Sequence, residues 1–297
     1  MPDPTREFDR QEMNCDALAA LEAVRAGLRH LGGDGPSVAE GILRSLRATH
    51  ETIDRLVADS PDKAGPDALA LTRLQIERTL LAALMADDPD RWVRIYLVAS
   101  WRSDVIHALN MQGFSAEAQA WSDDHEAHLM ELLKIGRHLK VREQDLQSIE
   151  QCYREGRVAD DARFKLERAP NPSEIRRYIA DPELRHLGSL FYCVLTPYNE
   201  WAHAGLGSAT YQMIENRRSQ EAGTTWDTYY YNAVVDRTLP YSWTAIMAVA
   251  TLFANRFNAH HETYGSIVRG WRRVAEQHAI GVAVWDTWAK AALGVLG

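Results

Sequence analysis

Apolar residues recur at spacings of three and four along nearly the whole chain, which is the period of an amphipathic α-helix. The pattern breaks where glycine, proline and aspartate cluster, at residues 32–36, 60–62, 87–89, 170–172 and 181–182 and at Pro240. Such residues cap helices or cannot continue them, so helices are expected to begin and end there. The breaks leave about ten helices, several of about 20 residues or more. The sequence therefore predicts an all-α multi-helix bundle.

Residues 224–237 are the exception, because β-branched and aromatic residues crowd them, among them Thr224, Trp226 and Val234. Such residues are enriched in β-strands. A short hairpin is one interpretation of this stretch, and a buried helix is the other.

The length of 297 residues fits one large domain or two small ones. Residues 170–172, Pro-Asn-Pro, are the best candidate for a seam, but neither flanking part has the features of a self-sufficient domain. We therefore predict a single all-helical domain over residues 1–297, with a weak seam at 170–172.

Charge and composition argue against several classes of function. The formal charge of −8 disfavours broad nucleic-acid binding, because such a field repels a phosphate backbone. The chain starts without the basic and apolar regions of a signal peptide, and its most apolar stretch, residues 241–257, carries enough polar residues to predict a buried core helix instead of a membrane span. The three scattered cysteines suit a reducing compartment. We expect a soluble cytoplasmic protein with no membrane association.

The helix expected over residues 69–84 carries two charges on its apolar side. At about 100° per residue, its solvent-facing side is expected to hold the polar residues Thr72, Gln75, Arg78 and Thr79. Arg73 and Glu77 lie within the opposite, apolar side, four residues apart and on one face. A buried charge without a partner is costly, so the two are expected to pair with each other or with another helix. The pair has two interpretations, a salt bridge that fixes helix register and a functional site.

The next expected helix, residues 92–110, repeats this pattern. Arg102 lies within its apolar arc, and His107 lies roughly 140° away around the helix. An arginine that extends its charged end to solvent accounts for this almost as well as a site does.

Hydrogen-bonding side chains border the apolar stripe of residues 191–206. Tyr192, Asn199 and His203 run along this border, and Tyr198 belongs to the stripe itself. Pro197 either interrupts one helix or occupies the first position of a second one. Asn199 and His203 stay one turn apart in both cases, whereas the position of Tyr192 depends on the choice.

These motifs together resemble a known family. Arg73-Leu-Gln-Ile-Glu77 is followed by a break and Trp92, and Tyr192 later precedes Asn199-Glu-Trp-Ala-His203. Over residues 69–207 the chain resembles a family of all-helical bacterial proteins of unknown function, with Asn199 where the family has serine. The resemblance implies a helical fold and the co-location of Arg73, Glu77 and His203, and it brings no known activity.

A ribonuclease of the HEPN type is the first enzyme hypothesis. That helical superfamily places an arginine, which holds phosphate, four to six residues before a histidine that acts as acid and base. The spacing occurs at Arg25/His30, Arg44/His50, Arg102/His107, Arg256/His261 and Arg273/His278. About three matches are expected by chance, so the motif counts only with its context. Arg102 and His107 are the best catalytic candidates because they follow the Arg73–Glu77 helix, and His203 is a further one.

A carboxylate-bridged metal site is the second enzyme hypothesis. Glu-x-x-His at Glu183/His186 and Glu200/His203 projects two ligands from one helix face. A di-iron bundle also needs two further glutamates from other helices, and Glu77 is the only evident candidate. Solvated helix faces explain these residues better, so we expect no metal and no cofactor.

The non-enzymatic interpretation is the one we favour. We predict a regulatory or interaction protein, of the kind that acts in stress or phage-defence systems, which binds a protein partner or a second copy of itself. Its site is expected to be a convergence of internal polar residues, Arg73, Glu77, Asn199 and His203, bordered by Tyr192 or Tyr198. The ribonuclease and the metal-site protein are the alternatives.

Overall fold

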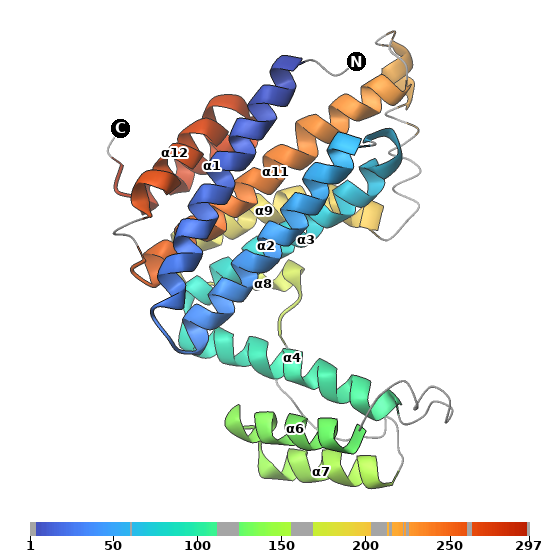
Figure 1. Ribbon diagram of the computed structural model, residues 1–297, viewed down its shortest axis with the longest axis vertical. Helices are drawn as coiled ribbons and strands as arrows, with labels where there is room; N and C mark the ends of the chain where they lie inside the picture. Colours follow the sequence, from blue (N-terminus) through green and yellow to red (C-terminus); the bar gives the residue numbers. More distant parts are fainter. Residues whose placement is uncertain are drawn as a thin grey trace. The chain divides into compact units, whose positions relative to one another are not determined.

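The computed structural model describes residues 4–59, 61–111, 125–155, 169–202, 213, 216–221, 223, 226–259 and 263–295. Helices occupy almost all of these residues, and no strand occurs among them (Figure 1). The all-α prediction is therefore confirmed. This part of the chain forms twelve α-helices and one π-helical turn, Trp285–Ala289, where the sequence predicted about ten helices.

The contacts of the chain divide it into two compact units. The larger unit consists of Met1–Asp87 and Asn171–Gly297, and the smaller unit is Asp88–Pro170. The single-domain organisation expected from the sequence stays a prediction.

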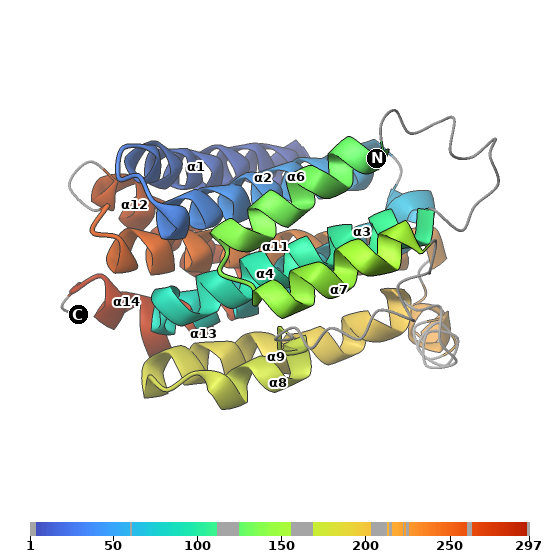
Figure 2. The same cartoon turned by 90° about the horizontal axis from the view of Figure 1, so that it is seen from below.

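The larger unit is a bundle around one buried helix. Its helices are α1 (Pro4–Arg29), α2 (Asp34–Asp59), α3 (Pro61–Asp87), α8 (Pro172–Tyr178), α9 (Pro182–Ala202), α11 (Trp226–Arg256), α12 (Tyr264–Gln277), α13 (Ala279–Val284) and α14 (Lys290–Ala292). Helix α11 packs against α1, α2, α3, α12 and α13, and Figures 1 and 2 show α1, α2 and α3 running beside it.

Helix α11 is buried on all sides over residues 242–254. Two of its polar residues bond locally: the hydroxyls of Thr244 and Thr251 donate to the carbonyls of Pro240 and Met247 at 2.7 and 2.8 Å. The prediction of a core helix over residues 241–257 is confirmed. Among the described residues, no helix is long and apolar enough to cross a membrane.

The hairpin interpretation of residues 224–237 is wrong for the described part of that stretch. Helix α11 begins at Trp226 and continues to Arg256, and Pro240 lies inside it without ending it. β-Branched and aromatic residues disfavour helix by only fractions of a kcal/mol each. Packing of one continuous helix against several neighbours outweighs so small a preference.

Local signals determine several helix ends as expected. Asn171 and Glu174 form a capping box at the start of α8, with Pro172 in the first turn. Asp181 begins α9 by accepting hydrogen bonds from the backbone N–H groups of Glu183 and Leu184. Predicted breaks at 170–172 and 181–182 therefore coincide with real helix boundaries.

The turn between α1 and α2 relies on two glycines. Gly32 and Gly33 have φ angles of 65° and 88°, a left-handed conformation that other residues adopt at a cost. The turn folds α2 back along α1, so residues late in α1 face residues early in α2.

The smaller unit contains α4 (Pro89–Met111), α6 (His125–His138) and α7 (Glu143–Arg154). Its core centres on Trp101, whose indole N–H donates to the carbonyl of Leu132 at 2.6 Å. Gly136 lies directly under this ring: a Cβ there would be 2.6 Å from Trp101 Cζ2 and 2.7 Å from Leu146 Cδ2. Only glycine, which has no Cβ, therefore fits at position 136 without displacing these neighbours.

We predict that two glycine-to-alanine changes have opposite effects. Gly136→Ala should lower the free energy of unfolding by about 1–2 kcal/mol, because overpacking outweighs the gain in helix propensity. Gly41→Ala, in α2 with open space around the new Cβ, should raise it by up to about 1 kcal/mol. Urea unfolding followed by circular dichroism measures both. A stabilised Gly136→Ala variant would contradict the packing described for the smaller unit.

Candidate functional site

Arg73 and Glu77 form the pair expected from the sequence. On α3, the Arg73 Nε donates to Glu77 Oε1 at 2.9 Å, and the two side chains are 20% and 23% exposed. The pair is half-buried, so part of each charged group reaches water. Its role as a functional site stays a prediction.

The predicted orientation of α3 is wrong in one respect. Thr72, Gln75 and Thr79, expected on a solvent-facing side, are buried, whereas Leu74 is exposed. Helix α3 packs against α2, α8, α9 and α11, so it has neighbours on most sides. The threonine hydroxyls donate to backbone carbonyls four residues earlier, and Gln75 donates across to the Leu46 carbonyl at 3.1 Å. Small polar residues that bond locally can be buried at little cost.

The other members of the predicted pocket are only partly described. Tyr192 is half-buried on α9, and the Arg176 guanidinium lies over its ring, 4.5 Å from the ring centre. This contact is a cation–π interaction between α8 and α9. The side chains of Tyr198 and Asn199, and all of His203, lie outside the described residues. Their convergence with Arg73 and Glu77 stays a prediction.

Arg102 and His107, the ribonuclease candidates, lie on α4 in the smaller unit. Arg102 is half-buried and His107 is exposed. Because α4 is continuous across both residues, their side chains leave the helix about 140° apart. Arg44 and His50 diverge as well, since the Arg44 side chain is 69% exposed and His50 is buried.

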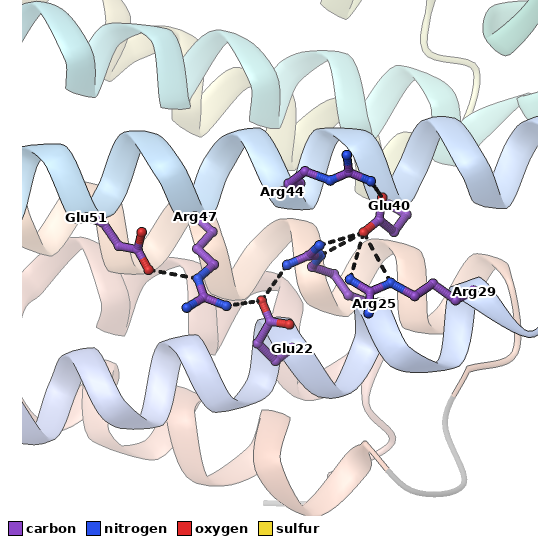
Figure 3. Close-up of polar contacts among 7 residues, drawn as sticks. All are labelled: Glu22, Arg25, Arg29, Glu40, Arg44, Arg47 and Glu51. Carbon is purple, nitrogen blue, oxygen red and sulfur yellow. Dashed lines mark hydrogen bonds and ion pairs between the residues drawn. The ribbon is translucent and has the colours of Figure 1, made fainter.

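A cluster of charged residues lies between α1 and α2, at residues that the sequence analysis did not choose as a candidate site. Figure 3 shows its seven members, Glu22, Arg25, Arg29, Glu40, Arg44, Arg47 and Glu51. We call this set the α1–α2 arginine cluster.

Glu40 is the centre of the α1–α2 arginine cluster. Its carboxylate is only 8% exposed and accepts hydrogen bonds from three guanidinium groups (Figure 3). Arg25 donates to Oε1 at 2.6 and 3.0 Å, and Arg29 donates to the same oxygen at 3.1 and 3.4 Å. Arg44 donates to Oε2 at 2.6 Å. One buried carboxylate thus holds arginines from both helices.

Glu22 links the two ends of the cluster. It accepts hydrogen bonds from Arg25 at 2.6 Å and from Arg47 at 2.8 Å, and Arg47 also donates to Glu51 at 2.7 Å. The charges are therefore balanced around Arg47, which has two carboxylate partners. The opposite end differs, because three arginines bond to Glu40, of which Arg25 also bonds to Glu22.

The arginines keep Glu40 ionised. Burial by itself would raise its pKa, but hydrogen bonds from Arg25, Arg44 and Arg29 outweigh burial and lower the pKa to about 2. Burial also opposes ionisation of Glu22, and bonds from Arg47 and Arg25 again lower that pKa. Glu22 and Glu40 are therefore both ionised at neutral pH.

The sequence contained a weak signal of this cluster. Charged residues recur at positions 22, 25 and 29 and at 40, 44, 47 and 51, spacings that keep each set on one helix face. Such stripes are normally solvated surfaces. That the two stripes face each other follows from the Gly32–Gly33 turn, which the sequence shows only as a helix break.

A second buried polar network surrounds His50. Its Nε2 lies 3.0 Å from Asn14 Oδ1, and its Nδ1 lies 2.7 Å from the Ser242 hydroxyl oxygen. The Trp243 indole N–H donates to the same Asn14 oxygen at 2.7 Å, which identifies that atom as an acceptor. His50 therefore carries its proton on Nε2, and Ser242 donates to Nδ1. Both ring nitrogens thus have hydrogen-bond partners while the imidazole is neutral. Because Asn14, His50 and Ser242 belong to α1, α2 and α11, the network connects these three helices.

Comparison with family models, with curated proteins and with solved structures gave no match. The resemblance to a bacterial helical family therefore stays an expectation. Within the described residues, no group of three or more histidine, cysteine, aspartate or glutamate residues could hold a metal ion. Of the residues in the metal-site alternative, Glu200 and His203 lie outside the described side chains.

We predict that Glu40→Gln destabilises the larger unit by about 2–4 kcal/mol, because it leaves the buried Arg25 with one carboxylate partner in place of two. Glu51→Gln removes a carboxylate whose side chain is 40% exposed and should cost less than about 1 kcal/mol. Urea unfolding at pH 7 measures both. If the two substitutions lower the free energy of unfolding equally, the burial of Glu40 does not increase its contribution to stability.

We predict that His50 makes stability fall in mild acid. Burial, opposed by Asp54 and Glu51, lowers the His50 pKa from 6.5 to about 4. Between these pH values the unfolded chain binds a proton that the folded chain does not, so stability is lost as pH falls from 6.5 to 4, by up to about 3 kcal/mol.

Unfolding free energies of the wild type and of His50→Gln across this pH range test the His50 prediction. The variant is expected to be less stable at pH 7 and to show a much flatter slope. The contribution of Glu40 lies lower, because its depressed pKa removes stability only as pH falls from 4.5 towards 2. Identical slopes for wild type and variant would refute the assignment to His50.

Proposed function

We propose that this chain is a regulatory protein-binding protein whose α1–α2 arginine cluster binds an acidic segment of a partner protein. The observation that supports this proposal is the unequal charge at the Glu40 end. Arg29 and Arg44, both held on the buried Glu40, have side chains that are 54% and 69% exposed. Exposed guanidiniums held in fixed positions are suited to carboxylates and other oxyanions.

The charge balance of the cluster is opposite to that of the chain. Its four arginines and three glutamates leave one positive charge, whereas the whole chain carries −8. A local patch of opposite sign attracts a complementary group and orients it, which adds to specificity and association rate.

A protein segment suits this surface better than a nucleic acid does. A long phosphate backbone would extend beyond the patch, and the net charge of −8 on the chain repels it. A short acidic segment contacts the patch alone. The protein-binding surface that we propose is therefore formed by the exposed arginines of α1 and α2.

We predict that a short glutamate-rich peptide binds the wild-type protein and that binding depends on Arg29 and Arg44. The double variant Arg29→Gln/Arg44→Gln should bind at least about ten-fold more weakly, because two charge-assisted contacts are lost. Fluorescence anisotropy of the labelled peptide at low salt measures the affinity, and raising the salt should weaken binding of the wild type.

Arg55→Gln is the matched control. Arg55 lies exposed on the same helix, outside the cluster, with its Nε bonded to the Glu51 backbone carbonyl at 3.2 Å. Its substitution removes one positive charge from α2 and is expected to change affinity less than about two-fold. If the control and the double variant weaken binding equally, the arginine cluster is not the binding surface and the proposal fails.

A further inference from the structure

We propose, building on the protein-binding function above, that the acidic group recognised by Arg29 and Arg44 is a phosphate carried on a side chain of the partner protein. Binding would then be regulated by phosphorylation of the partner. The argument rests on three features of the cluster: its local charge, its remaining hydrogen-bond donors and its fixed geometry.

The local charge around Glu40 is positive. Three guanidiniums, those of Arg25, Arg29 and Arg44, converge on the single carboxylate of Glu40. Arg25 is also bonded to Glu22, and Arg47, the other partner of Glu22, is bonded to Glu51 as well. The cluster therefore carries one positive charge in all, at the end where Arg29 and Arg44 are exposed. A phosphate monoester, which carries about −1.5 to −2 at neutral pH, is attracted to this charge more strongly than a carboxylate of charge −1 is.

The donors that Glu40 does not use point to the same ligand. A guanidinium has five N–H groups. Arg29 donates to Glu40 through Nε and one terminal nitrogen, and Arg44 donates through one terminal nitrogen. The other N–H groups of these exposed side chains are available to water or to a ligand. A phosphate presents three strong acceptor oxygens in a tetrahedral arrangement, so it offers these donors more acceptor oxygens than the two of a carboxylate.

Glu40 also fixes the two arginines before a ligand arrives. Arg29 comes from α1 and binds Oε1, whereas Arg44 comes from α2 and binds Oε2, so one carboxylate sets the positions of both (Figure 3). Arginine side chains lose considerable conformational entropy when they are ordered. Because Glu40 has already ordered them, less affinity is lost on binding. The side chain of Glu40 is thus a positioning group for the site.

Three peptides of one sequence test the proposal: one with a single phosphoserine, one with glutamate at that position and one with serine. The phosphoserine peptide is expected to bind the wild type about ten-fold more tightly than the glutamate peptide, and the serine peptide is expected to bind least. Arg29→Gln and Arg44→Gln should each weaken phosphopeptide binding about five- to ten-fold. Arg55→Gln should weaken it less than about two-fold. Circular dichroism and thermal unfolding of each variant verify that the fold is retained.

The outcomes separate this inference from the proposed function. Equal affinity for the phosphoserine and glutamate peptides, with both dependent on Arg29 and Arg44, overturns phosphate recognition and leaves the acidic-segment function standing. If the Arg29 and Arg44 variants bind both peptides as tightly as the wild type does, the phosphate inference and the proposed function are both overturned.

Two competitors identify the source of the phosphate. If inorganic phosphate displaces the phosphopeptide at concentrations near the dissociation constant of the peptide, the ligand is a free anion. If a short RNA competes more strongly than the peptide does, the ligand is a nucleic acid. Either result overturns the assignment to a protein segment.

Discussion

A carboxylate buried between two helices needs cationic partners, and in this protein Glu40 has three. Removing a carboxylate from water is unfavourable unless hydrogen bonds and opposite charges replace the lost hydration. The three guanidiniums supply both, and they are drawn from α1 and α2 together. The register of the α1–α2 pair is therefore tied to this contact: a one-turn slip would move the arginines of α1 about 5 Å from the carboxylate. The Gly32–Gly33 turn and the Glu40 contact specify the same alignment.

The same rule governs the rest of the larger unit, where buried polar groups connect elements that are far apart in the sequence. The His50 network joins α1, α2 and α11 through side chains of Asn14, Ser242 and Trp243. Gln75 of α3 bonds to the backbone of α2. Each contact requires one particular arrangement of helices, because a displaced partner would leave a buried donor or acceptor unsatisfied. Apolar packing around α11 supplies most of the driving force, and these contacts select among the ways in which helices could pack.

Much of the fold can be predicted from the sequence, because helix formation and helix ends depend on local patterns. The breaks at 170–172 and 181–182 were visible in proline and aspartate positions, and the buried helix over 241–257 was visible in its composition. The errors arose where tertiary neighbours decide. The composition of residues 224–237 left a short hairpin and a helix open, and α11 in fact runs through this stretch from Trp226. The solvent-facing side of α3 was misassigned because polar side chains with donors bonded inside the protein are compatible with burial: the Thr72 hydroxyl donates to the Ala68 carbonyl, and the Gln75 amide donates to the Leu46 carbonyl.

The candidate site was harder to predict for a related reason. The Arg73–Glu77 pair lies within one helix, and its four-residue spacing was sufficient to find it. The α1–α2 arginine cluster depends on two helix faces meeting, and neither face is distinctive alone. Glu40 and Arg44 form an ordinary i, i+4 pair by sequence. The contact becomes unusual only when α1 adds Arg25 and Arg29 to the same carboxylate.

The unequal charges of this cluster favour a binding role over a purely structural one. A salt-bridge network that served stability alone gains most when positive and negative charges alternate, because like charges in proximity repel. The Arg47 end follows that rule, with Glu22 and Glu51 on either side. The Glu40 end does not, since three guanidiniums crowd one carboxylate and two of them extend into solvent. The mutual repulsion of these guanidiniums would be relieved by an added anion. The Glu40 end, where positive charges exceed negative ones, is therefore the end of the cluster that an external oxyanion would stabilise most.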